Sequence, residues 1–259
     1  MTAPGNQQQV AIAIATCAWR RPHLTSAMLR YYMRAADALL PDGIMLTGAI
    51  AGSEGELSRQ LCNGTGFLYV ESPNRPLSRK WNSAVKLLRE CQPDAILIVG
   101  SDDWLSHGLL RAYARFLRDG CDYVALKDVY LIHANTKRCL LFTGTTGVAR
   151  MIRRDILDRL QWQLWPDTLN RSLDRVMGYR LDADGVTPSQ PWNGSMAQVA
   201  QDAVAVDIKT TTNLWSFRLL ARLTDKVSSC PYPEVMRHFN DIDRAEMEAA
   251  MQLECGAKH

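Results

Sequence analysis

A regular alternation in the first 120 residues constrains the fold of this chain more than any other feature. Short apolar runs of the kind found in buried parallel strands alternate with stretches that repeat apolar residues at helical spacing. The first such stretch opens at Pro22, a residue favoured at the start of a helix. This rhythm predicts an α/β fold with a doubly wound, mainly parallel sheet and helices on both faces. The expected strands are VAIAIAT (10–16), GIMLTGAIAG (43–52), GFLYVES (66–72) and DAILIVG (94–100).

The pattern changes after Gly120, where longer strands of antiparallel type begin, with a turn expected at Ala134–Lys137. We therefore expect residues 8–120 and 121–259 to form two halves of one continuous domain. Ser53 and Glu56 have the spacing of a capping box for a short helix. Further elements are expected at 153–161 and 170–178 (helices), 203–209 (strand) and 243–255 (helix).

The composition excludes several classes of protein. With 259 residues, 47% of them hydrophobic and 22% charged, the chain has ordinary globular values. A net charge of +3 is too small to indicate a nucleic-acid or membrane coat. No apolar run approaches roughly 18 residues, and the opening MTAPGNQQQ lacks the regions of a signal peptide. The seven scattered cysteines indicate reduced thiols, so we expect a cytoplasmic protein without a membrane partner.

Two adjacent carboxylates, Asp102 and Asp103, follow the last of these strands in the segment DAILIVGSDDWLS. Like charges repel, and buried carboxylates are costly, so something positive should receive them. Ligands of open parallel sheets bind at the carboxyl ends of the strands. Hard oxygen donors there, together with substrate phosphates, suit Mn²⁺ or Mg²⁺. The alternative is that one aspartate caps the helix expected from His107. Because two adjacent aspartates follow Gly-Ser here, we favour the metal site over the cap.

Three segments, taken in order, resemble the family 2-type glycosyltransferases of the GT-A fold. The resemblance spans roughly residues 8–180 and rests on IAIATCAWRRPHL (12–24), ESPNRPLSRKWNSAV (71–85) and ILIVGSDDWL (96–105). It implies that residues 8–120 bind a nucleoside-diphosphate sugar and that residues 121–259 form the acceptor side. The implied activity is metal-dependent, inverting transfer of a sugar to the hydroxyl group of a soluble acceptor.

The resemblance also implies the site residues. Asp102 and Asp103 take the places of the metal ligands, although the family motif Asp-x-Asp-Asp has Gly100 at its first position here. Thr16 and Cys17 would meet the nucleobase through their backbones. For Arg79 and Lys80, a solvated helix face is an equal alternative. The full set of expected donor contacts is Thr16, Cys17, Arg20, Glu54, Arg79, Lys80, Asn82, Ser101, Asp103, Lys209 and Asn213.

A general base is expected in the segment LWPDTLNRSLDRVMGYRL (164–181). Asp174 has the position that the resemblance implies, and Asp167 is its competitor. An ion pair of Asp174 with Arg171 or Arg175 on the helix surface is the structural alternative. Glycines in FTGTTG (142–147) would let the backbone approach the acceptor closely.

The acceptor stays open at this stage. Phage-type enzymes of this architecture glycosylate hydroxymethylated bases in DNA, and a phage-encoded protein would act in the host cytoplasm. A rim of basic residues would then follow the phosphates. Two other classes remain: a metal-dependent nucleotidyltransferase, although TCAWRRP is no glycine-rich phosphate loop, and a non-catalytic binding module. No oligomeric state is predicted. The arginines of the expected rim are Arg20, Arg21, Arg150, Arg153 and Arg154.

Overall fold

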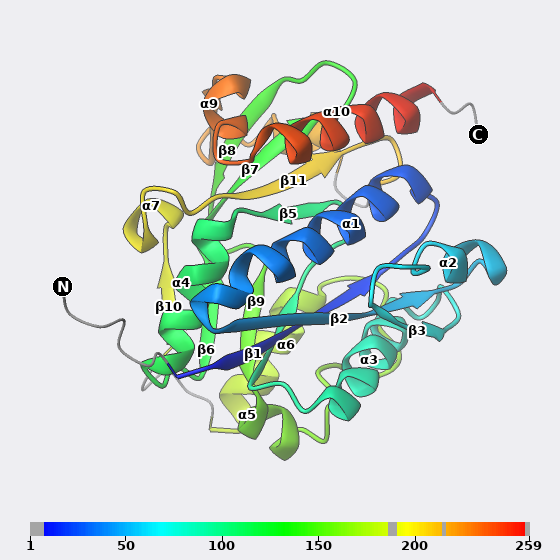
Figure 1. Ribbon diagram of the computed structural model, residues 1–259, viewed down its shortest axis with the longest axis vertical. Helices are drawn as coiled ribbons and strands as arrows, with labels where there is room; N and C mark the ends of the chain where they lie inside the picture. Colours follow the sequence, from blue (N-terminus) through cyan, green and yellow to red (C-terminus); the bar gives the residue numbers. More distant parts are fainter. Residues whose placement is uncertain (1–7, 186–190, 214–215, 257–259) are drawn as a thin grey trace.

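Two β-sheets form the frame of the structure, a computed structural model described for residues 8–185, 191–213 and 216–256 (Figure 1). The first sheet is mainly parallel, and only β9 runs against its neighbours β4 and β6. Residues 1–7, which carry most of the segment examined for a signal peptide, lie outside the described part. In spatial order the strands are β10 (Pro191–Gly194), β6 (Tyr123–Leu126), β9 (Arg150–Arg153), β4 (Ala95–Ile98), β1 (Val10–Cys17), β2 (Ile44–Gly52) and β3 (Leu68–Glu71).

The second, smaller sheet is mainly antiparallel. Its hairpin of β7 and β8 confirms the turn expected after residue 133, and β11 runs parallel to β7 but against β5. The expected α/β class, with a parallel sheet and a smaller antiparallel part, is therefore confirmed. In spatial order the strands are β12 (Val227–Cys230), β8 (Cys139–Thr143), β7 (Asp128–His133), β11 (Ala205–Lys209) and β5 (Asp103–Leu105).

The strand order places a topological switch point beside β1, and the region at the carboxyl ends of β1 and β4 is here called the crevice. The chain passes from β1 to β2 and β3 on one side and then returns to place β4 on the other side of β1. Such a reversal separates the connections that leave the carboxyl ends of the two strands, and ligands of open α/β sheets bind there. Here those ends are Cys17 and the residues that follow Ile98.

Side chains of β1 alternate between two cores. Ile12 and Ile14 point into the core that contains α1, α4 and α10, whereas Ala13 and Ala15 point into the core of α3, α5 and α6 (Figure 1). The helices therefore cover both faces of the sheet. The helices are α1 (Pro22–Leu39), α2 (Glu56–Gln60), α3 (Leu77–Leu87), α4 (His107–Arg118), α5 (Arg154–Arg159), α6 (Leu173–Ala183), α7 (Met196–Val199), α8 (Phe217–Leu220), α9 (Tyr232–Met236) and α10 (Asp241–Gly256), with 3-10 turns at Leu40–Asp42 and Leu88–Cys91.

One expected helix cap is wrong, and the alternative of an aspartate cap is excluded. Gly55, not Ser53, precedes α2, and the Ser53 hydroxyl instead accepts a hydrogen bond from the Lys80 ammonium group at 2.8 Å. Ser106 caps α4 by accepting from the backbone N–H of Leu109 at 3.2 Å. Neither carboxylate of the Asp102–Asp103 pair serves as the cap of this helix.

The cysteines agree with the expectation of free thiols. All seven are free, and Cys139 and Cys230 lie opposite each other on β8 and β12 with their sulfur atoms 2.8 Å apart. None of the described helices combines the length and the apolar character that a bilayer crossing requires.

Helices α1 and α10 are joined by ion pairs of different burial, and Glu246 of α10 pairs with both Arg30 and Arg34 of α1. Arg34 bonds Asp243, whose side chain is 2% exposed, at 2.7 Å. The Arg30 side chain, which is 45% exposed, pairs with Glu246.

Arg34→Met should lower the free energy of unfolding by about 3 kcal/mol, because it leaves the buried Asp243 carboxylate without its cation. Arg30→Met should cost about 1 kcal/mol or less. Urea unfolding measures both, and equal losses would contradict this account.

Candidate active site

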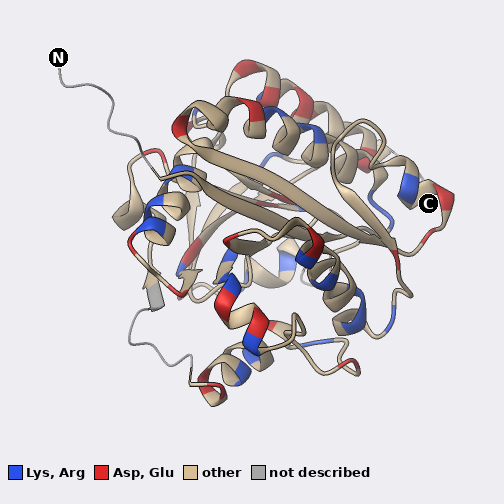
Figure 2. Cartoon of the chain, turned by 60° about the horizontal axis from the view of Figure 1, so that its bottom comes forward, with Lys and Arg blue, Asp and Glu red and all other residues tan. Residues whose placement is uncertain are grey.

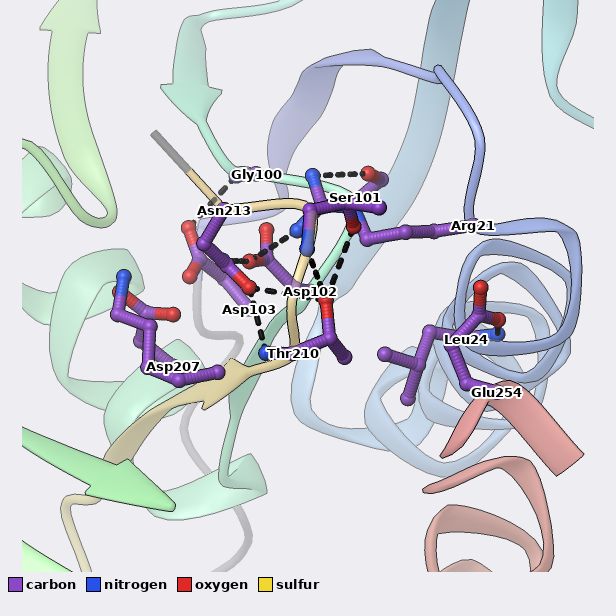
Figure 3. A network of polar contacts seen from close by, with 12 residues as sticks. Arg21, Leu24, Gly100, Ser101, Asp102, Asp103, Asp207, Thr210, Asn213 and Glu254 are labelled. Carbon is purple, nitrogen blue, oxygen red and sulfur yellow. Dashed lines mark hydrogen bonds and ion pairs between the residues drawn. The ribbon is translucent and has the colours of Figure 1, made fainter. Parts of the chain in front are cut away.

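Three buried carboxylates lie together at the crevice (Figure 3). Asp102, Asp103 and Asp207 place one carboxylate oxygen each within 4.8 Å of the others, and these residues are 6%, 5% and 8% exposed. Asp103 and Asp207 are cross-strand partners on β5 and β11, so the antiparallel pairing of these strands brings the third carboxylate in. The sequence analysis missed Asp207. Its signal was an aspartate inside the apolar strand AVAVDIK.

Gly100 lies in close contact with the carboxylates of Asp102 and Asp103. A Cβ atom at this residue would lie 2.8 Å from Asp103 Oδ2 and 2.9 Å from Asp102 Oδ1. The Gly100 N–H donates to the same Asp103 oxygen at 2.6 Å. A side chain at position 100 would therefore displace the ends of these two carboxylates, and the third carboxylate of the cluster comes from β11.

Two cations of the chain receive these carboxylates. The Arg21 guanidinium reaches from the start of α1 to form an ion pair with Asp102, and its Nη2 donates to Ser101 Oγ at 3.1 Å. Lys209 Nζ lies 2.5 Å from Asp207 Oδ2. Three carboxylates facing two cations leave one negative charge in excess.

The surroundings make this excess of negative charge costly. Burial raises the pKa of Asp103 well above its usual range, and the charges of Asp207 and Asp102 add to the effect. Burial also raises the pKa of Asp207, although Lys209 opposes it. For Lys209, burial works to lower the pKa, but the carboxylates of Asp207 and Asp102 outweigh it and the pKa rises. Lys209 therefore stays charged, whereas the charged forms of Asp103 and Asp207 are disfavoured and a further positive charge nearby would stabilise them.

The donor set fits a hard divalent cation. All of its acidic groups offer oxygen, which Mg²⁺ and Mn²⁺ prefer, and Oδ1 of Asp207 is buried without a hydrogen-bond partner among the described residues. Asp102, Asp103 and Asp207 would hold the ion. The expectation of a metal site is supported in this form, with a third acidic residue added to the expected pair.

The segment after β11 closes one side of this cluster. Asn213 Nδ2 donates to Asp102 Oδ2, and Asn213 Oδ1 accepts from the backbone N–H of Thr210 at 2.6 Å (Figure 3). The structure thus brings the expected donor residues Ser101, Lys209 and Asn213 to the carboxylates.

A second group of expected residues lies at the ends of β1 and β2, which pair in parallel. Arg20 has a left-handed backbone (φ 53°), and its N–H donates to Glu54 Oε2 at 3.0 Å. Its guanidinium lies 4.7 Å from the ring centroid of Trp19, which is 37% exposed. Burial raises the pKa of the Cys17 thiol, although the residue is partly exposed, and Thr16 is fully buried. Their contact with a nucleobase stays a prediction.

Lys80, one of the expected donor residues on α3, points into the protein. Lys80 is fully buried and donates to Ala18 O at 2.5 Å, Ser53 Oγ at 2.8 Å and Asn74 Oδ1 at 3.1 Å. Burial lowers its pKa. The alternative of a solvated lysine is wrong, and the amine ties together the loops beside the crevice. Arg79, by contrast, is exposed.

Asn82 also faces the protein. It donates to Asp167 Oδ1 at 2.7 Å and to Trp165 O at 2.8 Å, and it accepts from Leu164 N at 3.1 Å. These bonds dock residues 164–167 on α3. Asn82 and Asp167 are thus engaged with each other rather than turned to a ligand.

Asp174 lies at the same edge of the sheet as Gly100. It is exposed in the first turn of α6, and a Cβ on Gly147 would stand 2.2 Å from its Oδ1, so the carboxylate touches the glycine backbone. The segment that begins at Gly147 leads into Ala149, whose N–H bonds Ile98 O at 2.9 Å, next to the end of β4. No ion pair joins Asp174 to Arg171 or Arg175 in the described part of the chain.

The expected basic rim is wrong as a single surface. Arg150 lies at the carboxyl end of β4 opposite Ile98, where its guanidinium bonds the carbonyls of Thr146 and Asp174. Because β9 runs against β4, Arg153 lies opposite Ala95 and Arg154 bonds Asp94 O, at the far edge of the sheet. Figure 2 shows Lys and Arg residues distributed over several elements. A DNA acceptor stays a prediction without this support.

Comparisons with known proteins bear on the fold. No protein-family model and no curated protein matches the chain. It is similar to S. aureus TarS 1–349 in complex with UDP, with a TM-score of 0.54 and 9% identity over 82% of this chain and 64% of that one. A second structure of S. aureus TarS 1–349 has a TM-score of 0.52 and 10% identity over 95% of this chain and 71% of that one. The inositol-1-phosphate CTP transferase from T. maritima has a TM-score of 0.45 and 14% identity over 85% of this chain and 98% of that one.

At these identities the likeness to solved structures shows the fold alone. The GT-A-like α/β fold expected from the sequence is confirmed. The division of roles between residues 8–120 and 121–259 stays a prediction.

Gly100→Ala should damage the metal site more than the stability. Its Cβ would displace two carboxylate ends, which can move, so the free energy of unfolding should fall by about 1 kcal/mol. Mn²⁺ affinity should fall about tenfold or more, equivalent to about 1.4 kcal/mol, because two ligands shift together. Calorimetric Mn²⁺ titration and urea unfolding measure the two effects.

The matched control is Gly178→Ala. A Cβ at Gly178 on α6 meets nothing within 4 Å, so Mn²⁺ affinity should stay unchanged and stability should rise slightly. Wild-type Mn²⁺ affinity in Gly100→Ala would contradict the geometry described for the carboxylates.

Proposed function

We propose that this protein is a metal-dependent, inverting glycosyltransferase that moves a sugar from a nucleoside-diphosphate sugar to a hydroxyl of a soluble acceptor. The observation that carries the proposal is the cluster of Asp102, Asp103 and Asp207 at the crevice of a GT-A-like sheet. The similarity in fold to TarS in complex with UDP supports a nucleoside diphosphate as the ligand of this crevice.

The charges of the site suit the departure of a diphosphate. A divalent cation on the three carboxylates would supply positive charge for the developing leaving group. Arg21 and Lys209 contribute two cationic side chains of the chain beside it. Their buried position excludes water that would screen them. The exposed Arg79 and the backbones of Thr16 and Cys17 stand as further donor contacts in the proposal.

Asp174 is proposed as the general base. Its carboxylate would accept the proton of the acceptor hydroxyl while the acceptor oxygen attacks the anomeric carbon and the bond to the diphosphate breaks. One displacement of this kind inverts the anomeric configuration. The exposure of Asp174 beside Gly147 supports this role, whereas Asp167 is bonded to Asn82.

Binding of the nucleotide tests the first half of the proposal. Five nucleoside diphosphates (UDP, CDP, GDP, ADP and dTDP) and their common sugar conjugates are offered with Mn²⁺ or with EDTA, and thermal unfolding is followed. A ligand at about 100 times its dissociation constant adds about 2.7 kcal/mol of stability. We expect a Mn²⁺-dependent rise in unfolding temperature with one nucleotide, which Asp207→Asn abolishes. A rise that Asp207→Asn leaves intact would contradict the site.

The product distinguishes the reaction classes. Release of a nucleoside diphosphate from the sugar conjugate supports glycosyl transfer, whereas release of pyrophosphate from a nucleoside triphosphate would establish the nucleotidyltransferase instead. Metal-dependent nucleotide binding without any turnover would identify a binding module.

Asp174→Asn tests the base. This change should leave nucleotide binding intact and lower kcat by about 10³-fold, equivalent to about 4 kcal/mol in the activation barrier. Asp167→Asn is the matched comparison. It should lower stability through the loss of the Asn82 contact and retain turnover in the folded fraction. If Asp174→Asn is active while Asp167→Asn is folded and inactive, then Asp167 and not Asp174 is the general base.

A further inference from the structure

The side chain of Arg21 contacts the acidic cluster from the start of another element. It directly precedes Pro22 at the start of α1, yet its side chain turns away from the helix and crosses to the turn between β4 and β5 (Figure 3). There it meets Asp102 and Ser101. The guanidinium is largely enclosed, with 15% of the side chain exposed.

The contact of Arg21 uses the same carboxylate that a cation would need. Asp102 Oδ2 holds both Nη1 of Arg21 and Nδ2 of Asn213. A carboxylate in a charge-assisted contact of this kind has its negative charge compensated. A divalent cation that binds Asp102 must therefore compete with Arg21 or displace it.

Arg21 also has donors to spare. Nε of its guanidinium is buried and has no hydrogen-bond partner among the described residues. Although burial opposes its charge, the carboxylates of Asp102, Asp207 and Asp103 raise the pKa of Arg21, so it stays charged. A planar guanidinium with unused donors matches the oxygens of a phosphate group in pairs.

Lys209 provides a contrast within the same site. Its ammonium group pairs with Asp207 on its own strand, two residues earlier and on the same face. Arg21 comes instead from a separate loop, the connection between β1 and α1, and can change its partner without a change in strand pairing. The two cations therefore differ in their freedom to move.

We propose that Arg21 exchanges partners during binding: it holds Asp102 while the site is free of metal, and it binds phosphate oxygens once a divalent cation occupies the carboxylates. This inference rests on the proposed function, in that the phosphate belongs to the nucleotide. The exchange makes Arg21 a competitor of the cation in the absence of nucleotide and a ligand of the nucleotide in its presence. By linkage, nucleotide and cation then raise each other's affinity.

Opposite effects of one substitution test the exchange. Arg21→Met keeps an unbranched apolar stem and removes the guanidinium group with its charge. Mn²⁺ alone should bind this variant about tenfold more tightly than the wild type, a modest effect for a unit charge in direct contact. With Mn²⁺ saturating, the nucleoside diphosphate that stabilises the wild type most should bind it about tenfold more weakly. Free Mn²⁺ is measured by electron paramagnetic resonance and the nucleotide by calorimetry. Arg21→Gln is measured in parallel, with the same expectation.

The control is Arg30→Met on the same helix, whose arginine pairs with Glu246 away from the crevice. Both of its affinities should stay within about twofold of the wild type, since the lost charge lies outside the contact range of the site. Mn²⁺ affinity of Arg21→Met and Arg21→Gln that equals or falls below the wild-type value would overturn the exchange.

Asp207→Asn separates the two possible failures. If Asp207→Asn loses Mn²⁺ while Arg21→Met and wild type bind it equally, the metal site stands and the exchange is refuted. If Asp207→Asn and wild type bind Mn²⁺ alike, or no nucleoside diphosphate binds at all, the proposed function fails, and the exchange fails with it.

Discussion

Everything at the crevice depends on the cost of burying three carboxylates within one small volume. Asp102, Asp103 and Asp207 repel one another, and burial deprives them of water. The chain offsets this cost only in part, through Arg21 and Lys209. A folded protein retains such an arrangement where another positive charge completes it, and that requirement connects the acidic cluster to a metal and a phosphate ligand.

The arrangement of the two sheets brings the residues of this cluster together. The parallel sheet ends β1 and β4 at one crevice, and the chain then turns sharply at Gly100 to start β5 in the second sheet. Pairing of β5 with β11 sets Asp207 opposite Asp103. Packing supports the turn from behind: Trp104 is fully buried, and Tyr32 donates to the Asp103 carbonyl at 3.2 Å. The acidic cluster is therefore held by the framework on several sides.

Local patterns predicted the fold and two of the three carboxylates of the cluster. Apolar runs and helical periodicity placed most strands and helices, and the Gly-Ser-Asp-Asp segment pointed to Asp102 and Asp103. Asp207 was missed because its role depends on a pairing between strands about a hundred residues apart, which no local pattern encodes. Lys80 and Asn82 were placed on the wrong side because helical spacing does not reveal which polar residues face loops that dock on the helix. The arginine rim was wrong because β9 begins at Arg150 and ends at Arg153, so that these residues lie toward opposite edges of the sheet.

Anomalous diffraction from crystals grown with Mn²⁺ and a nucleoside diphosphate tests the central claim most directly. The account predicts one anomalous peak in contact with the carboxylates of Asp102, Asp103 and Asp207, with the diphosphate beside it. A nucleotide bound elsewhere, or a cluster that keeps only Arg21 and Lys209 as its partners at saturating Mn²⁺, would contradict it.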